Sequence, residues 1–477
     1  MHKISLSLIL TGLLTGCAIG PDYTKPDVAV PETFVHNETN TTSNIAVEST
    51  WWKSFNDPLL TQAIEEALTT NYDIQSSRAS VDALLGQFDQ AKSYLYPQIN
   101  ANASSDRKGV DNASNGGYQL REGITSTYAG SLSLASYEID LFGKVRRANE
   151  AARAALLSSE YASQTVKLSI TSSVAASYVK LSSIQSQIDL ARQNVALTKE
   201  LVEFNQLKYK HGVIAESVLL QSISEHESAK ATLSALEASK TAEEATFNTL
   251  LGRNPSPIQV SPIDSIALPK VPEALPSSLL SKRPDIASAE QNLIAANAKI
   301  GVAKAAYFPS IKLTGMLGVQ SLELSNFVSN PARIWEITPS ISVPIFSAGR
   351  IAGEIKTAEA DRNQSIALYK KTIVSAFNDT DNAIAQTSKA QQQTTFQLSR
   401  TAAIEKALTQ SKLRYHVGTI SYSDMLLVQQ QWLQAAQQLI IAKQNALIST
   451  ISLYKALGGG WSEEIKVPEP DLLPAGR

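Results

Sequence analysis

The chain has 477 residues, of which 42 are basic and 44 acidic, and its net charge at pH 7 is −2. This balance gives no support to a nucleic-acid partner, because binding to nucleic acid requires a basic surface. Only 6% of the residues are aromatic, and the long segments are rich in Ala, Ser, Gln and Leu. We therefore expect a mainly helical protein with thin apolar cores.

The N-terminus has the pattern of an export signal. The stretch "MHKISLSLILTGLLTGC" begins with Lys3, continues through an apolar core and closes on small residues before Cys17, the single cysteine. A bilayer-spanning helix needs about 20 apolar residues, and this core is shorter. "LLTGC" resembles the bacterial lipobox, which implies that Cys17 is acylated and becomes the first mature residue. Ala18, in place of Asp, implies an outer-membrane address.

The first part of the mature chain is rich in proline. Pro21, Pro26 and Pro31 predict an extended tether rather than a packed element. Trp51 and Trp52 follow, and two interpretations of them stay open. They either anchor a small region against the rest of the molecule or are ordinary core aromatics.

The sequence then contains an internal duplication. "LKYKHGV" at 207–213 is answered by "LRYHVGT" at 413–419, and each copy continues without Gly or Pro, to Leu251 and Leu457 respectively. Further segments match at nearly the same separation. A repeat of roughly 200 residues is far longer than solenoid repeats, so the chain consists of two related halves.

Each half contains two segments that alternate apolar with small or polar residues, the period of a β-strand. The clearest are "GSLSLASYEIDLFG" and "IWEITPSISVPIF". Each half therefore predicts one hairpin, at about 95–142 and about 307–348, with polar loops at about 104–118 and 320–332.

Four strands cannot close a barrel, and an open sheet edge in lipid would leave backbone groups unpaired. A membrane-spanning sheet therefore requires several copies of the chain. The smallest such barrels have eight strands, so the strand number allows a dimer as well as a trimer.

The predicted helices are long and have narrow apolar seams. From Lys144 to His211 there is no Gly or Pro, and such a helix would reach about 100 Å. Apolar residues recur at the seven-residue spacing of coiled coils, at Val174, Leu181, Ile188, Val195 and Val202 and again at Leu426, Leu433, Ile440, Leu447 and Tyr454. This pattern suits helices that contact neighbours sideways and face water on two sides, as in a hollow cylinder.

Motifs over the whole chain resemble one family. They are "GPDYTKP" after Cys17, "YEIDLFGK" at 137–144, "RPDI" at 283–286, "PIFSAGR" at 344–350 and "LYKALGGGW" at 453–461. Together they resemble the TolC-type outer-membrane factors, and more closely the OprM/NodT-like lipoproteins of RND-type tripartite efflux systems.

The resemblance implies a mainly α-helical protein with membrane β-structure. The expected assembly is a homotrimer with a twelve-stranded outer-membrane β-barrel, four strands per protomer, that continues into a twelve-helix periplasmic α-barrel. The expected segments are a signal peptide at 1–16, a lipidated tether and equatorial segment at 17–58, a first repeat at 59–252, a proline-rich equatorial linker at 253–283, a second repeat at 284–458 and a tail at 459–477.

In this family the two repeated turns, here about 207–216 and 413–422, lie at the periplasmic tip. The resemblance implies that they contact an adaptor protein, and the residues expected there are Tyr209, Gly212 and Gly418. Glycine at these positions suits a left-handed helix cap.

The entrance at this tip is held shut in the family by tyrosine and acidic side chains. Tyr415 matches the gate tyrosine, and Asp424 lies where an acidic constriction residue is often found. The chain departs from the family pattern at Ile420 and Leu427, where a basic and a second acidic residue are often found. Ser421 and Asp424 also form S-x-x-D, a helix-capping motif, so Asp424 is a gate residue, a cap or both.

The implied function is a passive exit duct for drugs or other small toxic compounds. Its expected partners are two further copies of the chain, outer-membrane lipid, a periplasmic membrane-fusion adaptor and an inner-membrane RND-type pump. No cofactor, metal or enzymatic activity is expected, because the sequence contains neither H-E-x-x-H nor a phosphate-binding glycine motif. The alternatives are a type I secretion channel and a periplasmic coiled-coil scaffold lipoprotein without a pore.

Overall fold

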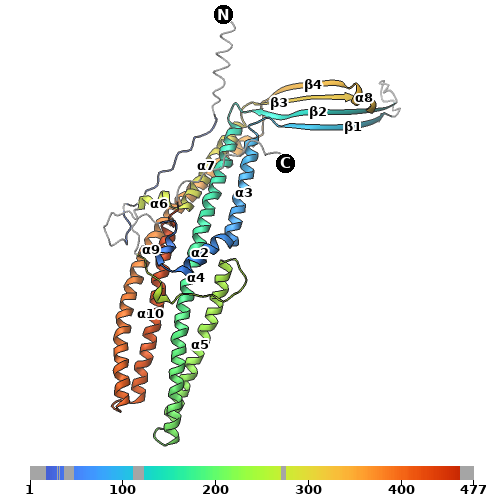
Figure 1. Cartoon of the computed structure of the whole chain (residues 1–477). Helices are drawn as coiled ribbons and strands as arrows, with labels where there is room; N and C mark the ends of the chain where they lie inside the picture. Colours follow the sequence, from blue (N-terminus) through green and yellow to red (C-terminus); the bar gives the residue numbers. More distant parts are fainter. Residues whose placement is uncertain are drawn as a thin grey trace.

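The structure is a computed structural model that describes residues 18–29, 31, 33–36, 48–110, 123–269 and 276–461. The expected signal peptide and Cys17 lie outside the described residues. The molecule is elongated, with a sheet at one end and the ends of two helical hairpins at the other (Figure 1). No helix in the described ranges combines the length and the hydropathy needed to cross a membrane.

The two halves repeat one order of elements. The first half contains α3 (Tyr72–Ser93), β1 (Ile99–Val110), β2 (Gly123–Ile139), α4 (Lys144–Lys210) and α5 (Glu216–Leu250). The second half contains α7 (Pro284–Ala305), β3 (Ser310–Ser321), α8 (Leu324–Ser329), β4 (Ala332–Ser342), α9 (Arg350–His416) and α10 (Tyr422–Ala456). Two further elements, η1 (Trp51–Phe55) and α2 (Pro58–Thr70), precede the first half, and two more, η2 (Ile263–Ser265) and α6 (Pro276–Lys282), lie between the halves.

The four strands form one antiparallel sheet in the order β1-β2-β3-β4. The two predicted hairpins are therefore joined edge to edge, because β2 of the first half pairs with β3 of the second. Within the described chain β1 and β4 are the two edges, and each leaves one row of backbone groups without a strand partner.

The pleat gives the sheet one apolar and one polar face. Leu132 pairs with Leu317, which pairs with Trp335, and these three side chains share a face. Asn102 and Ser131 pair on the opposite face. The apolar side chains are uncovered, and Trp335 is 71% exposed, so this face lacks a partner within one protomer.

The predicted loops are wrong in two places. β1 continues through Asp106 to Val110, because the ladder with β2 is made by the backbone and does not require apolar side chains at the end of the strand. The second predicted loop contains α8. A helix of six residues is too short to show a helical period in the sequence, so this element was missed.

A core in the middle of the molecule joins segments that are far apart in the sequence. The ring of Trp51 stacks on Tyr454 at 5.2 Å between centroids and meets Trp52 edge-on at 5.9 Å. The Tyr178 hydroxyl, on α4, donates to Asp57 at 3.0 Å. Burial raises the pKa of Tyr178 to about 12. Both tryptophans are buried core residues, and they hold η1 against α4 and α10.

The N-terminal segment 18–29 lies along α7 and α4. Asp22 forms an ion pair at 2.6 Å with Arg147, whose side chain is only 7% exposed. A Cβ added to Gly301 would lie 2.6 Å from the backbone oxygen of Ile19. Glycine is therefore required at position 301 for the segment to approach α7 this closely.

Candidate gate at the helical tip

The two tip turns have the same backbone geometry. In the first, the Val213 amide donates to the Lys208 carbonyl at 2.9 Å, and Gly212 has a φ of 69°. The second turn repeats these bonds, with Gly418 at 75°. This six-to-one bond closed by a left-handed residue is a Schellman motif. Glycine adopts positive φ without steric cost, so the geometry of the turns accounts for both glycines.

The Lys208 ammonium connects the two hairpins. It lies 4.3 Å from the centre of the Phe204 ring and 5.5 Å from that of Tyr415. It also donates to the Tyr415 hydroxyl at 3.3 Å. Lys208 and Phe204 belong to α4, whereas Tyr415 belongs to α9, so the cation bridges the two halves of one protomer. A cation over aromatic faces is attracted by their quadrupoles.

A second contact lies one helix further on. Tyr415 and Tyr422 have ring centroids 5.9 Å apart, and the buried Tyr422 hydroxyl has no hydrogen-bond partner within the described part of the chain. Burial raises the pKa of Tyr422, and the nearby Tyr415 and Glu225 add to this effect. Gln430 on α10 donates to Glu225 on α5 at 3.1 Å. The Gln430–Glu225 bond joins the two hairpins, whereas the Tyr415–Tyr422 contact lies within the second hairpin.

Asp424 caps the N-terminus of α10. Its carboxylate accepts from the Ser421 hydroxyl at 2.7 Å and from the Ser421 amide at 3.1 Å, while its own amide donates back to Ser421. These bonds from Ser421, aided by the charge of Arg414, lower the pKa of the exposed Asp424 carboxyl. The capping interpretation of Asp424 is therefore visible within one protomer.

The predicted site residues fall into two groups. Tyr415, Gly418 and Asp424 lie around the second turn, and Tyr209 and Gly212 lie at the first. Tyr209 is 42% exposed.

Lys208, Phe204 and Tyr422 were not predicted from the sequence as site residues. When the two repeats are aligned, Lys208 corresponds to Arg414. The alignment therefore gives no indication that Lys208 contacts Tyr415. The one feature of the sequence that pointed to these residues was the aromatic and basic composition of both turns.

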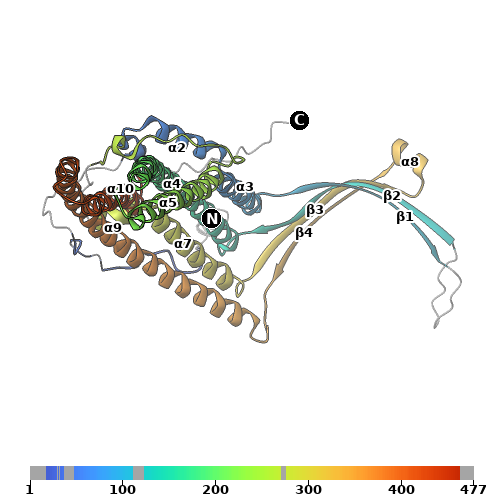
Figure 2. The same cartoon turned by 90° about the horizontal axis from the view of Figure 1, so that it is seen from below.

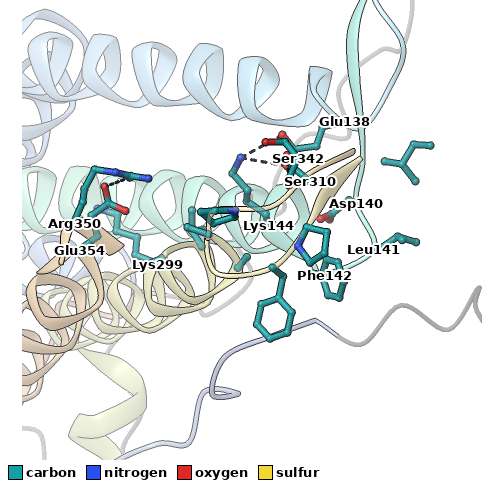
Figure 3. A pocket seen from close by; sticks show the side chains of 18 residues that line it. Glu138, Asp140, Leu141, Phe142, Lys144, Lys299, Ser310, Ser342, Arg350 and Glu354 are labelled. Atoms are coloured by element: carbon teal, nitrogen blue, oxygen red, sulfur yellow. Dashed lines mark hydrogen bonds and ion pairs between the residues drawn. The ribbon is translucent and has the colours of Figure 1, made fainter. Parts of the chain in front are cut away.

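A pocket of about 620 Å³ lies at the other end of the helices, where they meet the sheet (Figure 3). Lys144 forms an ion pair with Glu138 at 3.2 Å, and Arg350 pairs with Glu354 at 2.7 Å. Over the described ranges no group of His, Cys, Asp and Glu side chains could hold a metal ion. The Lys144–Glu138 pair connects α4 to the end of β2 at this junction.

The family described as "Outer membrane efflux protein" matches residues 63–253 and 275–459. The chain is 32% identical to the toluene efflux pump outer membrane protein TtgC of Pseudomonas putida, with 97% of each chain covered. It is 30% identical to the cation efflux system protein CusC of Escherichia coli, with 94% of this chain and 97% of CusC covered.

Among solved structures, the open state of the Neisseria gonorrhoeae MtrE outer membrane channel superposes with a TM-score of 0.83 at 30% identity. The superposition covers 94% of this chain and 100% of MtrE. These matches confirm the predicted TolC-type fold and the predicted role as an outer-membrane channel of RND-type efflux. The chain belongs to the outer membrane efflux protein family.

Proposed function

We propose that three copies of this chain form a passive duct through the outer membrane, acylated at Cys17 and continued into the periplasm by the helices. The observation that carries this proposal is the four-stranded sheet, which has two open edges and an uncovered apolar face. In lipid these edges must be paired, so β4 of one copy pairs with β1 of the next. Three protomers then give a twelve-stranded barrel, within the known range of outer-membrane barrels.

The helical tips supply the second part of the proposal. Apolar side chains remain exposed on both hairpins, at Phe204, Leu207 and Leu220 on one and at Leu413 and Leu427 on the other. Such seams favour contact with neighbouring helices, and copies around a threefold axis would bring the two kinds of hairpin side by side. The turns would then surround the entrance of the duct.

Tyr415 and Asp424 act in this proposal as the gate, with Lys208 as the residue that keeps the two hairpins of a protomer together. The exposed turn residues Tyr209, Gly212 and Gly418 form the surface for a periplasmic adaptor, which links the duct to an inner-membrane RND-type pump. Three carboxylates near one axis repel each other and attract cations. Asp424 can therefore cap its helix and narrow the entrance.

The pump, not the duct, selects the compounds in this proposal. One relative is named for toluene and another for cations, and substrates so different share no chemistry that a single protein site would bind. In this proposal the duct is a water-filled passage that is wide enough for many different compounds. The substrate class of this chain therefore follows from the pump with which it assembles.

The test is the behaviour of the full-length protein extracted from membranes in mild detergent. We expect an unheated sample to migrate as an oligomer of three subunits and a heated sample as a monomer. We also expect the oligomer to conduct ions in planar bilayers. A monomer that neither inserts nor conducts would exclude the duct and favour a periplasmic scaffold.

A further inference from the structure

The short helix α8, which connects β3 and β4, lies on the apolar face of the sheet. A Cβ built at Gly130 on β2 would point to the same side as Leu132 and would lie 3.2 Å from the ring of Phe327. Phe327 therefore sits directly over Gly130. Figure 2 shows α8 on the convex side of the curved sheet, the side that becomes the outer surface when such a sheet closes.

One side of α8 is also apolar. Leu324, Phe327 and Val328 follow the spacing of one helix face, whereas Ser325 and Asn326 lie on the other side. Leu324 is 62% exposed and Val328 is 86% exposed. The face that carries the Phe327 contact thus continues beyond the sheet as an uncovered apolar ridge.

The pairing of the strands gives independent evidence of where α8 lies relative to the apolar band of the sheet. Gly130 pairs with Val319, which pairs with Arg333, so these three positions form one row on the apolar face. Trp335 lies two residues closer to the helical end on the same face. Membrane β-barrels carry aromatic residues where the apolar band meets the headgroups, and a basic residue beyond them meets anionic headgroups. The row of Gly130 therefore lies near the outer boundary of the apolar band.

We propose that α8 is a membrane-surface anchor whose residues Leu324 and Val328 insert among the acyl chains at the rim of the outer leaflet. Phe327 seats the helix on the barrel wall. Lipid is the occupant because the ridge is continuous with the apolar face of the sheet and lies at its outer boundary. The inference rests on the proposed function, since it requires the sheet to span the outer membrane.

The test uses spin labels on single cysteines in the full-length chain. The protein is reconstituted in vesicles of phosphatidylethanolamine and phosphatidylglycerol, and collisions with oxygen and with a water-soluble nickel chelate are compared. The labelled variants are Val328→Cys, Ser325→Cys on the opposite side of α8, and Leu317→Cys in the apolar band as the lipid reference. The unmodified chain, which retains Cys17, gives the labelling background.

We expect the oxygen-to-nickel accessibility ratio at 328 to match that at 317 and to exceed that at 325. A ratio at 328 equal to that at 325, with 317 in lipid, would overturn the anchor and leave the duct intact. An aqueous signal at 317 would overturn both proposals.

The contact of Phe327 with the sheet is tested in the Val328→Cys protein. Adding Phe327→Ala should lower the accessibility ratio at 328, because the helix loses the side chain that holds it on the wall. The matched control is Asn326→Ala, which removes a polar side chain from the other side and should leave the ratio unchanged. Equal ratios in the two variants would contradict the proposed seating of α8.

Discussion

Replacing Lys208 with Met should favour the open state of the tip. The substitution keeps the length of the side chain but removes the ammonium that bridges α4 and α9. Lys208 makes two contacts across the hairpins, a cation–π contact at 5.5 Å and a hydrogen bond of 3.3 Å, both to Tyr415. The contact of Lys208 with Phe204 lies within α4, so it does not contribute to holding the two hairpins together.

The size of the effect follows from these contacts and from the threefold assembly. A cation–π contact at an exposed site contributes about 0.5–1 kcal/mol, and the long hydrogen bond of the partly exposed Lys208 adds little after solvent screening. If three tips open together, the loss is about 1.5–3 kcal/mol for the trimer. Since about 1.4 kcal/mol is a factor of ten, the ratio of open to closed duct should rise roughly 10- to 100-fold.

The assay is single-channel recording in planar bilayers. The matched control is Lys210→Met, which removes a charge from an exposed position of the same helix turn. Tyr415→Phe, which removes the hydroxyl, should shift the ratio in the same direction. The double variant should shift it by less than the sum of the two, because contacting residues are not additive. Open probability unchanged in Lys208→Met, or equal to that of Lys210→Met, would refute the bridging role.

Three further predictions concern the cap, the N-terminal segment and the central core. Asp424→Ala should lower the temperature at which the oligomer dissociates in a heated gel, and raised conductance in the same protein would show that the carboxylate also narrows the entrance. Because the folded-state pKa of Asp424 is lowered, its stabilisation is present at neutral pH and should be lost as pH falls below 3.8, with no such loss in Asp424→Ala. Gly301→Ala should destabilise the protein by about 1–3 kcal/mol through overpacking, measured by thermal unfolding. Gly86→Ala, where a Cβ meets open space, should not. Tyr178→Phe should cost about 1–3 kcal/mol, because it leaves buried partners of the hydroxyl unsatisfied, and a melting temperature equal to that of the unmodified protein would contradict this assignment.

Local patterns in the sequence were sufficient for the long helices, the two hairpins and the family, but not for α8 or the outer end of β1. Two related halves, long helices that end at Gly212 and Gly418, and strands of two-residue period were all visible. The spacing of apolar residues indicates which side of a helix or strand is buried, and glycine indicates where the backbone adopts positive φ. Both signals are local to one element of the chain. The resemblance of dispersed motifs then indicated the arrangement of the elements, and the comparisons confirmed it.

The tertiary structure alone decided which distant side chains meet. Lys208 contacts Tyr415 and not Arg414, its own repeat partner, because this contact depends on how two hairpins pack against each other, which no local pattern contains. The seating of Phe327 on Gly130 likewise depends on the register between β2 and β3 and on how a connecting segment folds back. The sequence by itself determined the long helices, the two hairpins and the faces that they bury, whereas the contacts between faces required the positions of both partners in space.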